Sequence, residues 1–223
     1  TDINGETYFT WGALVLAACS EDAGAELTVR AWGEEFIEEG IPADVFDDEW
    51  ALKYDRFLIN LGRVEVGQAG AAPALEEPQF QVFDLARASK GEGQLVVAGE
   101  VPAGSYSSTQ YKIYPADGDS VAGNASDADV KMMQGSKYSV FVSGTATKDG
   151  VEKSFAWGFK TSTSYEGCES TGKIAEGRPG AVQVTVHGDH LFYDDLYSET
   201  PMLLFGLVAR ADDDGDANGE VTQ

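Results

Sequence analysis

The sequence is poor in basic residues, with 15 Lys and Arg against 38 Asp and Glu and a formal net charge of −23 at pH 7. Proteins hold nucleic acids and anionic membranes through clustered Lys and Arg, so this charge balance excludes DNA or RNA binding. An acidic surface favours either cation binding or life in salty surroundings, and both readings stay open. Hydrophobic residues make up 43% of the chain, which argues for a folded core and against wholesale disorder.

Cysteine and histidine are also scarce. The two cysteines, Cys19 and Cys168, allow at most one disulfide, and without a C-x-x-C pair a thiolate zinc site is excluded. The two histidines lie close together, and the sequence has no Gly-x-Ser-x-Gly elbow, Walker motif or dinucleotide fingerprint. We therefore assign no catalytic residue from the sequence.

The apolar run at residues 11–18 is too short to span a bilayer but has the length of a signal-peptide core. Residues 16–19, Leu-Ala-Ala-Cys, resemble the bacterial lipobox, in which the cysteine is lipidated. This resemblance implies a protein of the bacterial cell envelope, either anchored to the outer membrane or periplasmic or extracellular, that contacts the membrane only through Cys19. Residues 1–6 contain neither a starting Met nor a basic segment, so a buried first strand is one alternative. A disulfide between Cys19 and Cys168 is the other.

Period-two alternation of apolar residues, bounded by turn residues, predicts a series of strands. They cover residues 27–32, 50–66, 80–85, 95–101, 111–114, 138–142, 153–159 and 182–186. Pro102 and Gly104 mark one tight turn, and Asp149 with Gly150 predicts a β-hairpin. Residues 117–129 are expected to form a polar loop.

The regular spacing of these strands predicts an all-β protein, an antiparallel β-sandwich with one or two short C-terminal helices. We expect a signal or lipobox-like segment and tether at residues 1–26, the sandwich at 27–200, and a helix with a cation-binding loop at 201–223.

Several short motifs between residues 50 and 115 resemble a family of bacterial cell-surface lipoprotein domains of unknown function. They are the strand that starts at Tyr54, the Asp84-Leu85 strand, the turn from Val101 to Tyr106, and Tyr111 to Tyr114. The resemblance implies an exported β-sandwich and no particular activity. A fainter resemblance, to methanobactin-associated copper-binding partner proteins, rests on Trp157 to Phe159, Cys168 and a later histidine-bearing strand. The copper ligands of those proteins are not carried over to this chain.

The acidic C-terminus resembles the first part of an EF-hand or dockerin-like calcium loop. Such a loop supplies oxygen ligands at alternate positions and needs glycine at its sixth position for a sharp turn. The matching residues, in order, are Asp214, Asp216, Asn218, Gly219, Glu220 through its backbone carbonyl, and Thr222. The sequence given ends at Gln223, before the closing glutamate, so we expect weak affinity. The alternative is a solvated acidic tail.

Both histidines lie in one short segment together with several carboxylates. His187 and Asp189 share a face if a strand continues, and His190 and Asp194 are neighbours if a helix begins near Asp189. Either geometry predicts a zinc or copper site. The alternative is that Asp189 caps a helix and the histidines are merely hydrogen-bonded.

These observations support three functional hypotheses. The first is a non-enzymatic, lipid-anchored envelope protein that binds divalent cations, with calcium at the C-terminal loop. The second is a zinc- or copper-dependent enzyme, or a copper-handling protein, that uses His187, Asp189 and His190. The third is a purely structural interaction module of the envelope.

Overall fold

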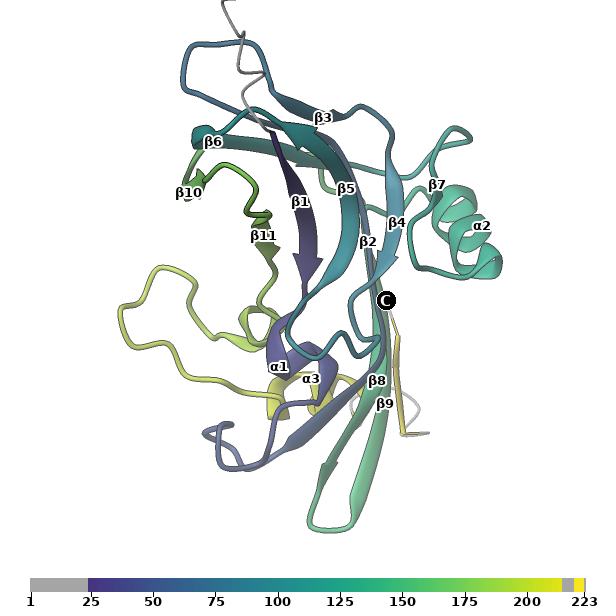
Figure 1. Cartoon of the computed structure of the whole chain (residues 1–223). Coiled ribbons are helices and arrows are strands. Elements are labelled where there is room, and N and C mark those ends of the chain that lie inside the picture. Colours follow the sequence, from purple (N-terminus) through teal and green to yellow (C-terminus); the bar gives the residue numbers. More distant parts are fainter. Residues whose placement is uncertain (1–23, 214–218, 223) are drawn as a thin grey trace, which may run out of the picture.

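Alternation of apolar and polar residues places one face of each strand inside the protein. In β1 (Ala25–Trp32), for example, Leu27, Val29 and Ala31 are at most 1% exposed while the residues between them reach solvent. The computed structural model describes residues 24–213 and 219–222, and it shows a mainly β protein of two packed sheets (Figure 1).

The smaller sheet has three strands in the order β11 (Gly180–Thr185), β1 and β5 (Gln94–Val101). The larger sheet has nine strands, and its main path runs through six of them. These are β10 (Thr163–Ile174), β6 (Gly104–Ile113), β2 (Ala51–Gly67), β8 (Val140–Lys148), β9 (Val151–Phe159) and β12 (Glu220–Thr222). Three short strands, β3 (Leu75–Glu77), β4 (Gln81–Asp84) and β7 (Val121–Ala122), extend the sheet beside β2.

The prediction of a purely antiparallel sandwich is wrong, because both sheets are mixed. β11 runs parallel to β1, β12 parallel to β9, and β7 parallel to β4. A tight hairpin forces its two strands to be antiparallel, whereas strands that meet after a long excursion can pair in either direction. Most strands of the large sheet lie between β1 and β11 in the sequence, so no local turn determines the direction in which β11 pairs with β1.

The local turn predictions are confirmed. β8 and β9 form the predicted hairpin, with Asp149 at φ 51° and Gly150 at φ 77°, as a tight hairpin turn requires. The turn at residues 102–103 joins β5 to β6, and the Tyr106 hydroxyl donates to the Pro102 carbonyl at 2.6 Å.

The structure has a few short helices, and not only near the C-terminus. α1 (Glu34–Glu38) follows β1, while the 3-10 turn η1 (Asp189–Phe192) and α3 (Gly206–Asp213) follow β11. α2 (Asp127–Ser136) begins inside the segment expected to be a loop. The Ser126 hydroxyl caps it by accepting from the Asp129 amide at 3.2 Å. Among the described residues, no helix combines the length and hydrophobicity needed to cross a membrane.

A group of aromatic residues packs against β9 of the large sheet. The Phe155 ring on β9 lies 6.3 Å from that of Phe192 and 6.0 Å from that of Phe205, measured between centroids. Phe192 ends η1 and Phe205 immediately precedes α3, so these rings hold the segment around residues 187–209 against the sheet.

A buried ion pair fixes α3 to β9. Lys153 on β9 contacts the Asp212 carboxylate, whose side chain is 0% exposed. The same oxygen of Asp212 accepts from the Gly219 amide at 3.2 Å, at the point where β12 begins. One carboxylate therefore joins the helix, the sheet and the start of β12.

Replacing Asp212 with alanine leaves the Lys153 ammonium group buried without this partner. We expect Asp212→Ala to lower the free energy of unfolding by about 3–5 kcal/mol. The double variant Lys153→Met with Asp212→Leu should lose clearly less, because no charge stays buried. Urea unfolding of the three proteins measures both values, and a single variant as stable as the double variant contradicts the prediction.

Candidate metal centre

The two histidines lie where the chain leaves the small sheet. β11 ends at Thr185, and the Val186 amide still donates to the Trp32 carbonyl at 2.8 Å. At Gly188 the backbone presses against α1 and β2, since a Cβ there would lie 2.6 Å from Cγ1 of Ile37. The buried Tyr54 hydroxyl on β2 donates to the Gly188 carbonyl at 2.7 Å. Two features therefore hold this corner in place. Gly188 has no side chain, which allows the close approach to α1 and β2, and the buried Tyr54 hydroxyl donates a hydrogen bond to its carbonyl.

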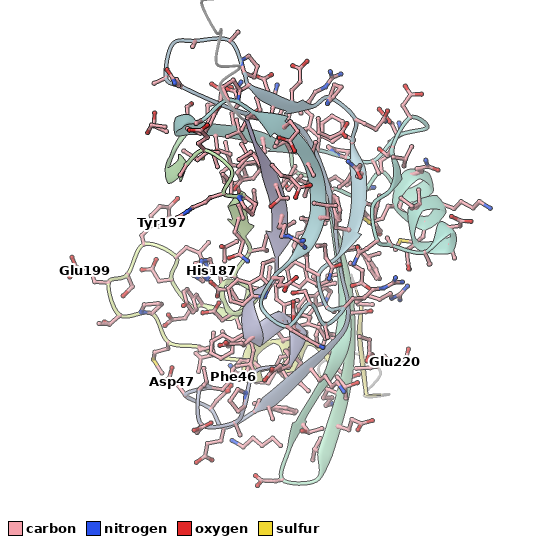
Figure 2. All side chains as sticks on the ribbon, viewed as in Figure 1. Phe46, Asp47, His187, Tyr197, Glu199 and Glu220 are labelled. Carbon is pink, nitrogen blue, oxygen red and sulfur yellow. The ribbon has the colours of Figure 1, made fainter. Side chains whose placement is uncertain are left out.

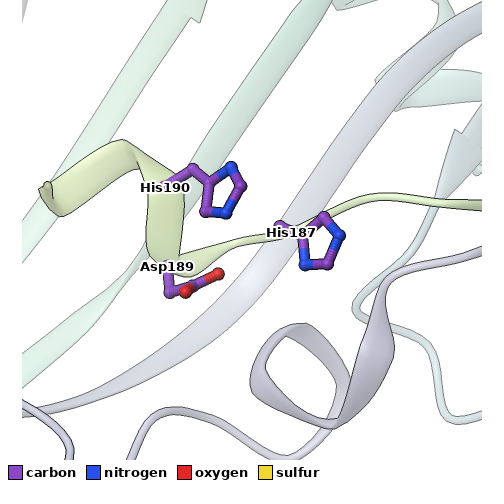
Figure 3. A group of neighbouring side chains, drawn as sticks. All are labelled: His187, Asp189 and His190. Carbon is purple, nitrogen blue, oxygen red and sulfur yellow. The ribbon is translucent and has the colours of Figure 1, made fainter. Parts of the chain in front are cut away.

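His187, Asp189 and His190 come together at this corner (Figure 3). One potential ligand atom from each lies within 4.8 Å of the others. Both histidines are exposed and Asp189 is half-buried. The two imidazole rings are stacked, with centroids 4.8 Å apart and planes inclined by 9°. The predicted grouping of these three residues is thus present in the fold.

The two carboxylate oxygens of Asp189 have different surroundings. Oδ2 accepts from the Tyr193 hydroxyl at 2.6 Å. Oδ1 is buried and has no hydrogen-bond partner among the described residues. Buried acceptors are normally satisfied, so an orphaned carboxylate oxygen needs a donor or a cation.

Glu34 adds a second carboxylate to the corner. Its Oε2 lies 3.0 Å from Nδ1 of His187, and its own backbone is in the left-handed region at φ 54°. A hydrogen bond from Nδ1 to a carboxylate orients the ring and leaves Nε2 for a metal, as is usual for histidine ligands. The segment that carries the site supplies no basic side chain other than its histidines, because no Lys or Arg occurs between residues 179 and 209.

Two tyrosines beside Asp189 stay neutral. The hydrogen bond to Asp189, together with burial and the charge of that carboxylate, raises the pKa of Tyr193 to about 12. Burial and the same charge raise the pKa of Tyr54 well above its usual value. Both phenols therefore act as donors over the physiological range, Tyr193 to Asp189 and Tyr54 to Gly188.

The corner has the donor types of a zinc or copper site but is more open than a closed one. Ligand atoms around a tetrahedral zinc lie about 3.3 Å apart, given bonds of about 2.0–2.1 Å. The lone pair of an imidazole nitrogen lies in the plane of the ring, and the two ring planes are nearly parallel here, so one ring must rotate before both can bind the same ion. Both rings are exposed, but such a rotation must break either the contact of His187 Nδ1 with Glu34 or the packing of the His190 ring on Tyr193, whose centroids lie 4.7 Å apart.

Asp194, the fourth predicted ligand in this segment, does not join the group. The predicted helix is only the four-residue turn η1, and Tyr193 after it is extended, with ψ 133°. Asp194 instead accepts from the Met202 amide at 2.9 Å and closes the base of a long loop. Tyr197 and Glu199 project from this loop, and Tyr197 is 97% exposed (Figure 2).

The alternative reading of Asp189 as a helix cap is also wrong. Gly188 occupies the cap position of η1, and no side chain makes a capping hydrogen bond there. Sequence reasoning missed Glu34, Tyr54 and Tyr193 as neighbours of the site. Glu34 and Tyr54 are far away along the chain, and no local pattern reveals their approach.

The predicted calcium loop is described only in its last part. Asp214, Asp216 and Asn218 lie outside the described residues, as does Cys19. Gly219 adopts φ 84°, the left-handed backbone that the sixth position of such a loop needs. Glu220 to Thr222 form β12, on the opposite side of the molecule from His187 (Figure 2). Cys168 is a free thiol.

Alternation along β12 determines which carbonyl could meet a cation. The Gly219 carbonyl accepts from the Ser154 amide at 2.8 Å, and Val221 is buried beside Phe155. Since alternate residues of a strand face the same neighbour, the Glu220 carbonyl faces away from β9. This is the carbonyl that the calcium-loop pattern uses.

Comparison with known protein families, with curated proteins and with solved structures finds no match for this chain. The family resemblances seen in the sequence therefore stay predictions. The structure itself shows a mostly β protein with two mixed sheets.

The contact between Asp189 and Tyr193 can be tested by titration. Asp189→Ala removes the acceptor and the charge, so the pKa of Tyr193 should return from about 12 toward 10. Because folding raises this pKa, the stability that the contact supplies is complete below pH 10 and is lost as pH rises through 12. The ultraviolet absorbance of phenolate, compared with that of Tyr193→Phe, measures the shift. An unchanged titration in Asp189→Ala would exclude the contact.

Proposed function

We propose that the protein is a non-enzymatic, divalent-cation-binding protein of the bacterial cell envelope, with a zinc or copper site at His187, Asp189 and His190. The observation that carries this proposal is the convergence of three ligand atoms within 4.8 Å, one of them supplied by a half-buried carboxylate. The envelope location rests on the lipobox-like residues 16–19 and on the acidic surface.

The chemistry of the donors supports a transition metal at this corner rather than calcium or magnesium. Two imidazoles and one carboxylate suit zinc or copper, whereas the harder cations prefer sites made of oxygen ligands. Glu34 supplies the outer carboxylate that commonly orients a histidine ligand. Three protein ligands leave a fourth position for water or for a ligand from a partner.

Exposure of the site argues for binding rather than catalysis. Metal catalysis gains from a dry, shaped cavity in which electrostatic interactions are strong. His187 and His190 are both exposed, so solvent reaches the metal position freely. We therefore place the metal-dependent enzyme second and the cation-binding protein first.

Calorimetric titration with zinc tests the site. His190→Ala and Asp189→Asn each remove one ligand and should weaken zinc binding at least tenfold. Glu34→Gln should weaken binding about tenfold, because it removes only the group that orients His187. Asp194→Asn is the matched control and should bind like the wild type, since Asp194 is held by the Met202 amide. Equal affinity in all five proteins would sink the proposal.

The identity of the metal needs a different measurement. Copper(II) binds most nitrogen and oxygen sites more tightly than zinc, so higher affinity in solution does not show which metal the protein holds. Elemental analysis of the protein purified without chelator, beside His190→Ala purified in the same way, decides between the two. Copper in the wild type alone supports the copper-handling alternative.

We propose a second cation site at the C-terminal loop, where the bound ion is calcium. It is supported by the left-handed Gly219 at the sixth position of the pattern and by the outward-facing carbonyl of Glu220. An exterior location would expose this loop to calcium. The site would act independently of the histidines, because Glu220 and His187 lie on opposite sides of the molecule (Figure 2).

Calcium titration followed by calorimetry tests this second site. We expect weak binding, with a dissociation constant on the order of 10⁻⁴–10⁻³ M, as in extracellular calcium modules. Asp214→Ala should abolish the heat, while Asp195→Asn, an acidic residue on the distant loop, should leave it unchanged. Identical isotherms for the two variants would show that calcium binds only to the general acidic surface.

A further inference from the structure

Two β-bulges face each other across the same part of β6. In β2, Arg63 and Val64 together lie opposite the single residue Tyr111 of β6, between the pairs Gly62–Lys112 and Glu65–Gln110. In β10, Glu166 and Gly167 together lie opposite the single residue Gln110 of β6, between the pairs Tyr165–Tyr111 and Cys168–Thr109. Bulges redirect side chains and are common beside binding sites. Here they bring Arg63 and Glu166 to the same short stretch of the sheet.

A cavity of about 150 Å³ lies between the bulges. Tyr111 and Tyr165 form one wall, stacked with centroids 4.6 Å apart and planes inclined by 15°. Tyr165 is 39% exposed, so part of its surface is open to a ligand. Burial, with smaller effects of Tyr165 and Cys168, raises the pKa of Tyr111 to about 12 and keeps its hydroxyl neutral.

The polar groups of the cavity carry both donors and acceptors. Arg63 and Lys112 supply positive charge, and neither forms an ion pair within the part of the chain that the structure describes. Glu65 and Glu166 supply acceptors, and the Gln110 amide donates to Glu65. The lining is therefore close to neutral overall, in a protein of net charge −23.

The backbone of Arg63 has a conformation that is unfavourable for a residue with a β-carbon. Its φ of 53° lies in the left-handed region, where a β-carbon is strained and glycine is preferred. Such strain persists where the surrounding structure imposes it and is concentrated at functional sites. The bulge thus holds a guanidinium group beside the tyrosine pair at a cost to stability.

We propose that this cavity binds one pyranose ring of a carbohydrate. A sugar ring has an apolar C–H face that can lie on an aromatic side chain, and a rim of hydroxyls that both donate and accept hydrogen bonds. The stacked tyrosines match the face, while Arg63, Gln110 and the two glutamates match the rim. The glutamates oppose a phosphate group, and the polar lining opposes a fatty acyl chain. The volume suits a single ring rather than a longer chain.

An array of immobilised oligosaccharides built from neutral hexoses and N-acetylhexosamines, followed by calorimetric titration of the bound glycan, tests the proposal. The wild type should bind at least one glycan. Tyr165→Ala should weaken that binding at least tenfold, and Glu166→Ala, at a surface position of the bulge, should weaken it several-fold. Tyr197→Ala is the control, since this exposed tyrosine lies on a different loop and should leave binding unchanged.

Arg63→Gly separates a functional arginine from a structural one. Glycine relieves the left-handed strain, so the melting temperature should rise while glycan binding falls several-fold. No glycan bound by the wild type, or equal binding by Tyr165→Ala and Tyr197→Ala, would overturn the proposal. Arg63→Gly that binds glycan as tightly as the wild type would overturn it as well.

Discussion

The fold depends on β2, a strand of 17 residues that is hydrogen-bonded to β3, β4, β6 and β8. Its residues 57–62 are all buried. Their side chains must therefore be apolar on both faces of the strand, or, where they are polar, must form hydrogen bonds inside the protein. The histidine corner and the cavity both depend on this strand. Tyr54, near its start, holds the corner that carries the histidines, and Arg63, at its bulge, lines the cavity.

The acidic residues have several different roles in the structure, which explains why their spacing in the sequence is a poor guide to function. The Asp84 carboxylate accepts from the amides of Phe57 and Ala86, and its burial raises its pKa. Asp48 accepts from the Gly206 amide where α3 begins. Asp212 pairs with Lys153 inside the protein. Carboxylates of these kinds hold loops in place, and Asp189 differs because it lies beside two imidazole rings, with one potential ligand atom of each of the three residues within 4.8 Å of the others.

Most strands could be predicted because their side chains alternate between core and solvent. β1, β8 and β9 carry enough apolar residues for this pattern to be read directly. β10 could not be predicted in this way. It is an edge strand rich in Ser, Thr, Gly and Glu, so its sequence lacks the apolar alternation, and its pairing with β6 depends on backbone hydrogen bonds. α2 was missed for a related reason. Only Val130 and Met133 are buried on it, so its apolar pattern is short.

The sequence alone determined the mainly β character, the hairpin at Asp149 and Gly150, and the proximity of His187, Asp189 and His190, because all three follow from residues close together in the chain. Only the tertiary structure decided the parallel pairings, the approach of Glu34 to His187, and the separation of Asp194 from the histidines. It also brought Arg63, Tyr111 and Tyr165 from three strands to one cavity. Contacts between distant segments depend on strand order and register, and local side-chain patterns do not encode these quantities.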